Sequence, residues 1–468
     1  MTVVGDDAEP RLVVPLPVIA LPHGQPRLSR QPAVRVTVRG RSLRLRGMQN
    51  PATGVLAVLL VLGPGFIAAT AGDDAGGIAM YSQIGARYGY EPLWVLLLIT
   101  LSLALIQETC ARLGAATGRG LLDLVRERFG IGWALFAVGV VLLANGGGVV
   151  TEFVGIAAAA ELFGISRYFA VPVAGILLWY LVIQGSYVSM EKIFLAMALI
   201  FFAYPLAAVL AHPDWGAVAR GALVPTLRAE PQYLTLFVGL IGATITPYVL
   251  LFQQSSVVEK GVPRRRYGPE RFDAYFGSVF SNIIAAFIVI ATAATLHAGG
   301  VTDIQTASDA AQALQPLVGD AAQALFALGL LGASLLAAGV LPLATAYSVA
   351  EAFGFRKGVD LDFRRAPVFV GFFSALIVLG ALVALIPRLP LIQLLVGIQV
   401  LNGMLLPVIL VFLLLLINDR RLVGSLKNGP VYNVLSWGTV GLVSLAVVCL
   451  LGTQLLSATG LHVLDGGG

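Results

Sequence analysis

Charged residues are scarce in this sequence, and their scarcity indicates the class of protein. They make up 12% of the 468 residues, while hydrophobic residues make up 58%. Soluble globular domains carry about 25% charged residues. The composition therefore excludes an ordinary soluble domain and indicates a chain that lies mostly in lipid.

Cysteine and histidine are also rare. The two cysteines, Cys110 and Cys449, lie far apart in apolar runs, which excludes a disulfide framework and a thiolate metal site. The four histidines fall in the tails or near the edges of apolar segments. No cofactor is expected, and no imidazole is available in a central segment to exchange protons near neutral pH.

Long apolar runs are what the chain has in abundance. About eleven segments of roughly 20 residues or more are each long enough to span about 30 Å of hydrocarbon. The sequence thus predicts an all-α integral membrane protein with about 11 transmembrane helices. We expect the spans at residues 52–86, 91–111, 132–163, 168–187, 191–211, 232–258, 274–297, 321–353, 366–387, 391–417 and 432–456.

The basic residues lie mostly on one side of these spans. Residues 1–47 form a polar tail rich in Arg and Pro, without a signal peptide, which we expect to be disordered and cytoplasmic. With the N-terminus inside, 25 of the 30 Lys and Arg residues lie in cytoplasmic segments. This asymmetry predicts a multi-pass protein of the plasma (inner) membrane with its C-terminus outside. Because the basic residues are dispersed over short loops, they do not indicate nucleic-acid binding.

Two adjacent acidic residues in the first span mark a candidate site. Asp73 and Asp74 lie within GPGFIAATAGDDAGGIAMYSQIGA, residues 63–86. A carboxylate at bilayer depth costs about 2.5–3.5 kcal/mol on insertion scales, so such residues usually mark an ion or substrate path. The glycines on either side disfavour a continuous helix. A helix that unwinds here would free backbone carbonyls to join the acids around a cation.

The sixth span contains a second interruption. Pro247, in GATITPY at residues 242–248, removes a backbone donor and exposes carbonyls near Ala243 and Thr244. Broken first and sixth spans are typical of transporters built from two inverted repeats of five helices. We therefore expect the two interruptions to face each other in the middle of the membrane.

Several short motifs, in their order and spacing, resemble the Nramp family of divalent-metal transporters over about residues 50–425. They are GPGF at 63–66, DAGG at 74–77, ARLGAATG at 111–118, EFVG at 152–155, GATITPY at 242–248, QV at 399–400 and NDRRLVG at 418–424. The resemblance implies the LeuT-type fold, with two inverted five-helix repeats, broken helices 1 and 6, and the ion held between them. It divides the chain into the tail at 1–47, a first repeat at 48–211, an extracellular loop at 212–231, a second repeat at 232–418, and an eleventh helix with a short outer tail at 419–468.

The chain departs from the family pattern at the ion site. Where the family has Asp-Pro-Gly-Asn and Met-Pro-His, this chain has DAGG at 74–77 and TPY at 246–248. Exchanging a soft thioether for a hydroxyl favours hard ions such as Mg²⁺ or Mn²⁺. The loss of two direct contacts also leaves room for an ion that keeps part of its water. The pattern is most similar to the Nramp-related magnesium transporters, a branch of the family.

The groups that typical members use for protons are also replaced. The two histidine positions of the sixth span align with Tyr248 and Gln253, and an Asp position of the third span aligns with Val149, whereas Glu152 is kept. We therefore expect uncoupled movement of the cation down its gradient. A proton relay through the remaining acids is the alternative.

The residues and the resemblance together assign a candidate metal site. Asp74 is expected at its centre and Asp73 beside it, either as a direct ligand or through water. The other expected contributors are the carbonyls of Ala71 and Ala243 and the side chains of Thr246, Gln399 and Asn402. The candidates for a proton or gating role are Glu152, Tyr248 and Glu108.

Two of these candidates have simpler interpretations. Glu108 also fits an ion pair with Arg112 four residues later on the same helix, and this pairing is favoured over a role in transport. Tyr248 also fits simple packing in the interior.

The sequence thus predicts a secondary-type transporter, and not an enzyme, that moves Mg²⁺, and also Mn²⁺, into the cell by alternating access. A proton-coupled Mn²⁺/Fe²⁺ carrier and an organic-substrate transporter of the same fold are the alternatives. An intramembrane aspartyl protease would need two carboxylates from different segments, and the other central spans as predicted offer no Asp. The expected partners are the metal ion and membrane lipid. A monomer is compatible with the sequence, which does not fix the oligomeric state.

Overall fold

The computed structural model describes two parts of the chain. The described residues are 35–38, 41–44, 64–184, 193, 203–210, 212–228, 230–264, 267–305, 309–310, 321–358, 361, 363–387 and 389–458. The chain divides into two compact units, Met1–Leu60 and Val61–Gly468. In the first unit, β1 (Arg35–Val38) pairs antiparallel with β2 (Arg41–Arg44), with Arg35 opposite Arg44. The rest of the tail lies outside the described residues, so its disorder stays a prediction.

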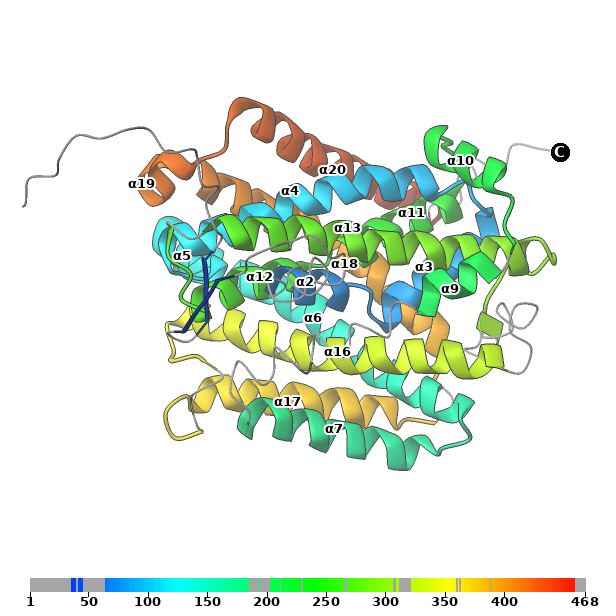
Figure 1. Ribbon diagram of the computed structural model, residues 1–468, viewed down its shortest axis with the longest axis horizontal. Coiled ribbons are helices and arrows are strands. Elements are labelled where there is room, and N and C mark those ends of the chain that lie inside the picture. The colour runs from blue at the N-terminus through cyan, green and yellow to red at the C-terminus, as the bar shows by residue number, and fades with distance from the viewer. Residues whose placement is uncertain are drawn as a thin grey trace, which may run out of the picture. The chain divides into compact units, whose positions relative to one another are not determined.

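The described residues of the second unit are helical (Figure 1). The helices are α2 (Pro64–Ala71), α3 (Ala75–Tyr88), α4 (Leu93–Thr117), α5 (Leu121–Phe129), α6 (Ile131–Leu162), α7 (Arg167–Gln184), α9 (Ala203–Leu210), α10 (Trp215–Leu223), α11 (Pro231–Thr244), α12 (Pro247–Glu259), α13 (Tyr267–Thr292) with the π-helical turn η3 (Ala293–His297), α16 (Ala321–Phe353), α17 (Pro367–Ala384), α18 (Leu391–Asn418), α19 (Arg420–Val423) with η4 (Gly424–Leu426), and α20 (Pro430–Ala458).

These helices agree with the predicted spans. Among the described residues, 8 stretches are long and apolar enough to cross a membrane, and a shorter apolar helix covers Arg167–Ile183. The broken first span corresponds to α2 and α3, although its beginning lies outside the described residues. The fifth predicted span is described only at residue 193 and in α9. The prediction of an all-helical membrane protein is confirmed for this unit.

Both predicted interruptions are present. The first lies between α2 and α3, where Asp74 is extended (φ −71°, ψ 179°) and caps α3 by accepting a hydrogen bond from the Gly77 N–H at 2.6 Å. The second lies between α11 and α12, where Pro247 begins the new helix. Proline suits the first position of a helix because that position needs no N–H donor. Local sequence therefore explains where each span breaks.

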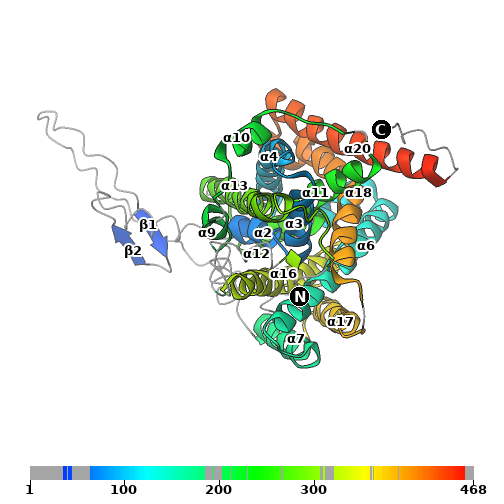
Figure 2. The ribbon, with the colours of Figure 1, turned by 90° about the vertical axis from the view of Figure 1, so that its right-hand side faces the viewer.

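The broken helices lie at the centre of the unit. Viewed along the bundle, α2, α3, α11 and α12 are surrounded by α4, α6, α13, α16 and α18, and α7 packs beside α17 at one edge (Figure 2). Glycines allow two of the closest crossings. A Cβ on Gly65 would lie 2.7 Å from the Ala274 nitrogen of α13, and one on Gly242 would lie 2.1 Å from the Gln399 carbonyl oxygen of α18. These crossings bring the interruptions close to α13 and α18.

Two short helices, α5 and α10, fall in segments predicted as loops. α5 buries Leu121, Leu122, Leu124 and Val125 on one face and carries charged side chains on the other. It joins α4 to α6 at the end of the bundle where α19 also lies (Figure 1). Both helices have 9 residues, too few for a membrane span, so a search for apolar spans does not find them.

Candidate metal site

Asp74 is the residue around which the candidate site is built. Its side chain is 1% exposed, although it carries a carboxylate. Oδ1 accepts hydrogen bonds from the Gly77 N–H at 2.6 Å and from Gln399 Nε2 at 2.8 Å, and Oδ2 lies 3.2 Å from the Tyr248 hydroxyl. Three elements therefore converge on one carboxylate: the start of α3, the middle of α18 and the start of α12.

The carbonyl of Ala71 lacks the hydrogen bond that a continuous helix would give it. In a continuous helix it would accept from the N–H four residues later, at Ala75. That N–H instead donates to Glu152 Oε2 of α6 at 3.3 Å. The Ala71 carbonyl accepts a hydrogen bond from the Tyr248 hydroxyl. The sixth span thus reaches across the interruption and contacts two of the predicted ligands.

The interruption of the sixth span frees a second carbonyl. The helical partner of the Ala243 carbonyl would be the nitrogen of residue 247, which is proline and has no hydrogen to donate. Thr246, the N-cap of α12, makes no side-chain capping bond. Its hydroxyl is buried and has no hydrogen-bond partner among the described residues. This carbonyl and this hydroxyl therefore lie in the short segment before Tyr248, whose own hydroxyl contacts Asp74.

Gln399 and Asn402 lie on one face of α18. Asn402 Nδ2 donates to Gln399 Oε1 at 2.9 Å, and Gln399 Nε2 donates to Asp74. Gly76 leaves the space for this contact, since a Cβ there would lie 2.3 Å from Gln399 Nε2. The structure brings both predicted side chains into one hydrogen-bonded chain that ends on the carboxylate.

Asp73 lies in the same interruption, with its N–H donating to the Thr70 carbonyl and with Ser281 of α13 close to its carboxylate. Its side chain is 0% exposed, and neither carboxylate oxygen has a hydrogen-bond partner among the described residues. A buried charge without a partner is costly, so a nearby cation would stabilise this carboxylate strongly. Asp73 therefore fits a position beside the ion, as a direct ligand or through water.

Glu152 and Glu108 are placed differently. Glu152 is buried in α6 and contacts the first turn of α3, next to Asp74. Glu108 forms an ion pair with Arg112 at 3.2 Å and accepts a hydrogen bond from the Tyr267 hydroxyl. Neither Glu108 nor Arg112 contacts the Asp74 cluster. The ion pair between Glu108 and Arg112 is thus present. Nothing in the geometry supports a transport role for Glu108.

Sequence reasoning missed Asp273, which positions α2. Asp273 is 1% exposed in α13 and accepts from the Gly65 and Phe66 N–H groups at 2.7 and 3.2 Å. It lies just before the span predicted at 274–297, in a polar stretch that gave no signal of burial. The statement that the other central spans offer no Asp is wrong for α13, but Asp273 caps α2 and does not contact Asp74.

The donors differ from a closed metal cage. No group of three or more His, Cys, Asp or Glu side chains in the described part of the chain is arranged to hold a metal ion. The cluster instead combines one or two carboxylates with neutral oxygens of carbonyls, amides and hydroxyls. Such a site suits a hard cation that is bound reversibly.

Comparison with known proteins agrees with this architecture. A family model described as natural resistance-associated macrophage protein-like (Nramp) matches residues 65–453. The divalent metal cation transporter MntH of Deinococcus radiodurans is 32% identical over 409 residues, covering 84% of this chain and 89% of that protein. MntH of Yersinia pestis is 31% identical over 286 residues, or 59% of this chain and 69% of that protein.

Solved structures share the fold. The manganese transporter of Eremococcus coleocola superposes with a TM-score of 0.72 at 20% identity, over 90% of this chain and 91% of that chain. MHP1, a nucleobase-cation-symport-1 family transporter, gives a TM-score of 0.54 at 14% identity, over 86% and 92% of the two chains. The LeuT-type fold is confirmed. The prediction that the protein is not an enzyme is also confirmed, because the relatives are named as transporters. The chain belongs to the Nramp family.

Proposed function

We propose that the protein carries divalent metal cations across the membrane by alternating access, with Mg²⁺ as a preferred ion and Mn²⁺ as a second one. The observation that carries this proposal is the convergence on Asp74 of two helix interruptions. Tyr248 at the second interruption contacts both Asp74 and the Ala71 carbonyl at the first. The Ala243 carbonyl and the Thr246 hydroxyl, which lie just before Tyr248 in the chain, are the further ligands of this proposal. The names of the relatives, divalent metal cation transporter and manganese transporter, support the same class of cargo.

The choice of Mg²⁺ rests on the chemistry of the donors. The atoms around Asp74 are oxygens and amide nitrogens, with no sulfur or imidazole among its hydrogen-bond partners. Oxygen ligands suit Mg²⁺ and Mn²⁺, whereas thioethers favour softer metals. Mg²⁺ sheds its water reluctantly and is usually bound through one or two carboxylates with several waters retained. In this proposal Asp74, with Asp73 next to it in the chain, supplies the carboxylates of such a site.

The amides can adapt when an ion arrives. Gln399 now presents its Nε2 to Asp74 and its Oε1 to Asn402. Rotating both amides by 180° would present Gln399 Oε1 to a cation and keep the hydrogen bond to Asn402 in the opposite direction. The same pair therefore serves the ion-free and the ion-bound site.

We propose further that transport is uncoupled from protons. No histidine contacts Asp74, Asp73 or Glu152 in the described part of the chain, and His297 instead bonds the Ala86 carbonyl at the end of α3. The alternative is a proton-coupled manganese carrier, in which Glu152 takes or gives the proton. The contact of Glu152 with the Asp74 segment favours this alternative over a relay through Glu108.

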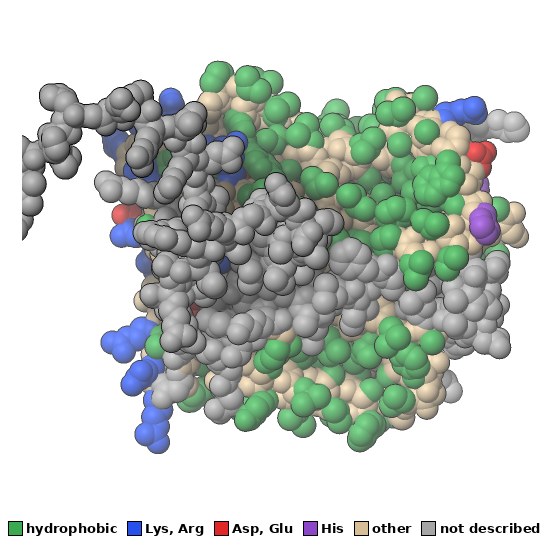
Figure 3. Space-filling model, in the orientation of Figure 1, with side chains coloured by type: hydrophobic (Ala, Val, Ile, Leu, Met, Phe, Trp, Pro, Cys, Tyr) green, Lys and Arg blue, Asp and Glu red, His purple; other side chains and the backbone are tan. Residues whose placement is uncertain are grey.

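The proposed orientation places the N-terminus in the cytoplasm, the C-terminus outside, and the protein in the plasma (inner) membrane. Lys and Arg gather at the end of the bundle that carries α5 and α19, as the positive-inside rule predicts for a cytoplasmic face (Figure 3). Lipid is then the partner of the exposed apolar side chains on α7, α17 and α20.

The test is Mg²⁺ uptake by proteoliposomes that contain the purified protein and a pH-sensitive dye. We expect Mg²⁺ uptake without acidification of the lumen. We expect D74N to lose this uptake. Mn²⁺ uptake with acidification and no Mg²⁺ uptake would overturn both the ion preference and the uncoupled mechanism. Uptake of an amino acid in place of either metal would overturn the proposal as a whole.

A further inference from the structure

Helix α12 contacts the candidate metal site at one end and a buried ionic cluster at the other. Its first residues, Pro247 and Tyr248, lie at the site. Ser255 is seven residues further along, which corresponds to about 10 Å of helix. Because an α-helix is stiff over this length, a constraint on Ser255 also limits the movement of Tyr248.

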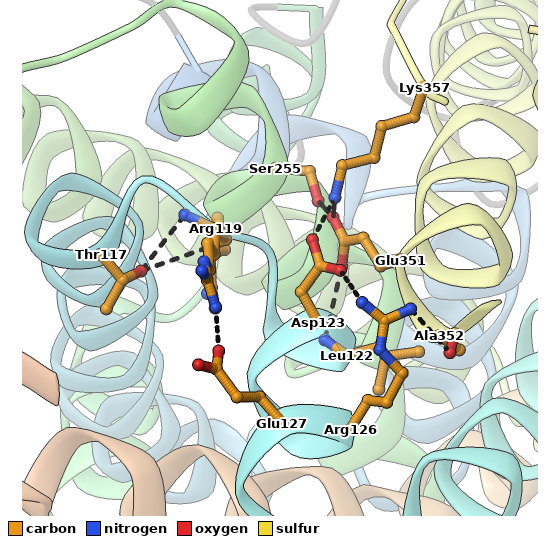
Figure 4. A network of polar contacts seen from close by, with 11 residues as sticks. Thr117, Arg119, Leu122, Asp123, Arg126, Glu127, Ser255, Glu351, Ala352 and Lys357 are labelled. Carbon is orange, nitrogen blue, oxygen red and sulfur yellow. Dashed lines mark hydrogen bonds and ion pairs between the residues drawn. The ribbon is translucent and has the colours of Figure 1, made fainter. Parts of the chain in front are cut away.

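The cluster is centred on Glu351 near the end of α16 (Figure 4). Glu351 is 1% exposed and accepts from the Ser255 hydroxyl at 2.9 Å and from the Leu122 N–H at 3.4 Å. Lys357 Nζ lies 3.0 Å from Glu351 Oε1 and 2.7 Å from Asp123 Oδ2. One lysine therefore bridges two carboxylates, one from α16 and one from α5, while α12 donates to the first.

A second contact holds α12 to the connection between α4 and α5. Gln254 Nε2 donates to the Arg119 carbonyl at 2.9 Å. Gly120 in the same connection lies against the cluster, since a Cβ there would be 1.8 Å from Glu351 Oε1. Only glycine lets the connection approach this closely. The end of α12 is thus bound on one side by α16 and on the other by the turn before α5.

Arg126 completes the cluster. It donates to Asp123 Oδ1 at 3.2 Å and to the Ala352 carbonyl at 3.3 Å (Figure 4). The side chains of Asp123, Arg126 and Lys357 are 20%, 33% and 21% exposed. These three groups can therefore regain water if the cluster separates, whereas Glu351 is fully buried while it is closed.

We propose that a latch closes the predicted cytoplasmic end of the transport path and must separate before an ion is released there. The latch is formed by Ser255, Gln254, Glu351, Lys357 and Asp123. The latch joins α12 to α5 and α16, so its separation frees the helix that carries Tyr248. Removing one partner of a buried ion pair leaves an uncompensated charge, so the contacts form and break together. By linkage, whatever moves Tyr248 at the ion site also changes the stability of the latch.

The test measures how fast a thiol on α12 reacts when no metal is present. Ser256 is 1% exposed and lies next to Ser255, so S256C in a C449S background reports opening of this end. The reagent is a membrane-impermeant maleimide, applied to the purified full-length protein. The latch variants are K357Q and S255A. E127Q is the control, because among the described residues Glu127 forms an ion pair with the exposed Arg119 side chain and has no polar contact with α12 or α16.

We expect K357Q and S255A each to raise the labelling rate of S256C about tenfold, as for loss of a hydrogen bond to a charged group. E127Q is expected to change it by less than about twofold, as for an exposed ion pair. Cys110, which is buried in α4, must stay unlabelled in every variant, and this shows that the fold is intact. Unchanged labelling in both latch variants, with Cys110 protected, overturns the proposal.

This outcome is independent of the proposed cargo. The labelling assay contains no metal, so a faster rate in K357Q and S255A supports the latch even if Mg²⁺ uptake fails. Conversely, Mg²⁺ uptake with unchanged labelling overturns the latch and leaves the transport proposal intact.

Discussion

The hydroxyl of Tyr248 donates a hydrogen bond to the carbonyl of Ala71, and the same hydroxyl lies 3.2 Å from Asp74 Oδ2. It therefore occupies the space between two atoms that we assign to the ion. Loading the site with a cation requires this hydroxyl to move or to become part of the coordination. The contact links ion binding to the position of α12, and several predictions depend on it.

Asp74 is expected to be indispensable for transport. D74N keeps the size of the side chain and one acceptor oxygen but removes the charge that attracts a cation. We expect Mg²⁺ uptake to fall at least about tenfold, a loss of 1.4 kcal/mol or more at the site. D214N is the matched control, because Asp214 caps the exposed helix α10 and asparagine caps equally well. Wild-type uptake by D74N would refute the assignment of the site.

Removing the Tyr248 hydroxyl is expected to strengthen metal binding. In Y248F the ion no longer competes with a hydrogen bond worth about 1 kcal/mol, so the Kd for Mn²⁺ should fall about fivefold in calorimetry. Y81F serves as the control, since the Tyr81 hydroxyl bonds Thr244 at 3.3 Å and does not contact Asp74. Weaker binding by Y248F would instead show that the hydroxyl belongs to the bound state.

A soft ligand at residue 246 is expected to change the preferred ion. Thr246 is 0% exposed at the start of α12, and T246M places a thioether beside Asp74. The ratio of Cd²⁺ to Mg²⁺ uptake should then rise about tenfold, because thioethers favour softer metals. T246V controls for loss of the hydroxyl alone. An unchanged ratio in T246M would show that residue 246 does not face the ion.

The substitution E152Q distinguishes uncoupled transport from proton-coupled transport. If Glu152 only accepts a hydrogen bond from Ala75, E152Q should keep Mg²⁺ uptake within about threefold, because the amide oxygen can still accept that bond. A proton relay through Glu152 predicts the opposite result, with both metal uptake and acidification abolished. Parallel dye and metal measurements on the same vesicles distinguish the two.

The latch is expected to be insensitive to pH over the physiological range. Burial would lower the pKa of Lys357, but the carboxylates of Glu351 and Asp123 outweigh burial and raise the pKa above its ordinary 10.5. A raised lysine pKa stabilises the folded contact below pH 10.5, and this contribution is lost only as the pH rises through the folded value. The ratio of S256C labelling rates in K357Q and the parent should therefore not fall as the pH rises from 7 to 9, because Lys357 stays charged over this range. A ratio that falls over this range would contradict the ion pair.

Hydropathy and local sequence were sufficient for the spans and their breaks. Apolar length placed the helices, and Asp74 and Pro247 each interrupt a helix through their own chemistry, as a cap and as a residue without an N–H. The short helices α5 and α10 were not predicted, because 9 residues cannot span a membrane and a search for apolar spans does not find them. The burial of one face of α5 depends on neighbours that the sequence does not reveal, whereas α10 buries no residue.

The contacts of the site could be predicted only in part. The family resemblance pointed to Gln399 and Tyr248, but which donor reaches which oxygen of Asp74 depends on how α18 and α12 pack. Asp273 gave no signal, since its partners in α2 are more than 200 residues away in sequence. Glu351 lies inside the span predicted at 321–353, but its contact with Ser255, 96 residues away, could not be read from the sequence. Such long-range pairings follow from the fold and cannot be derived from spacing.

The residue after Asp74 determines whether a backbone hydrogen bond can join α3 to α6. Because residue 75 is alanine, its N–H can cross to Glu152 and join the first turn of α3 to α6. A proline at this position has no hydrogen to give, and the two helices would then be held by packing alone. In this protein the first turn of α3 is therefore tied to α6 by a backbone hydrogen bond, whereas α2 is held at its start by Asp273 of α13.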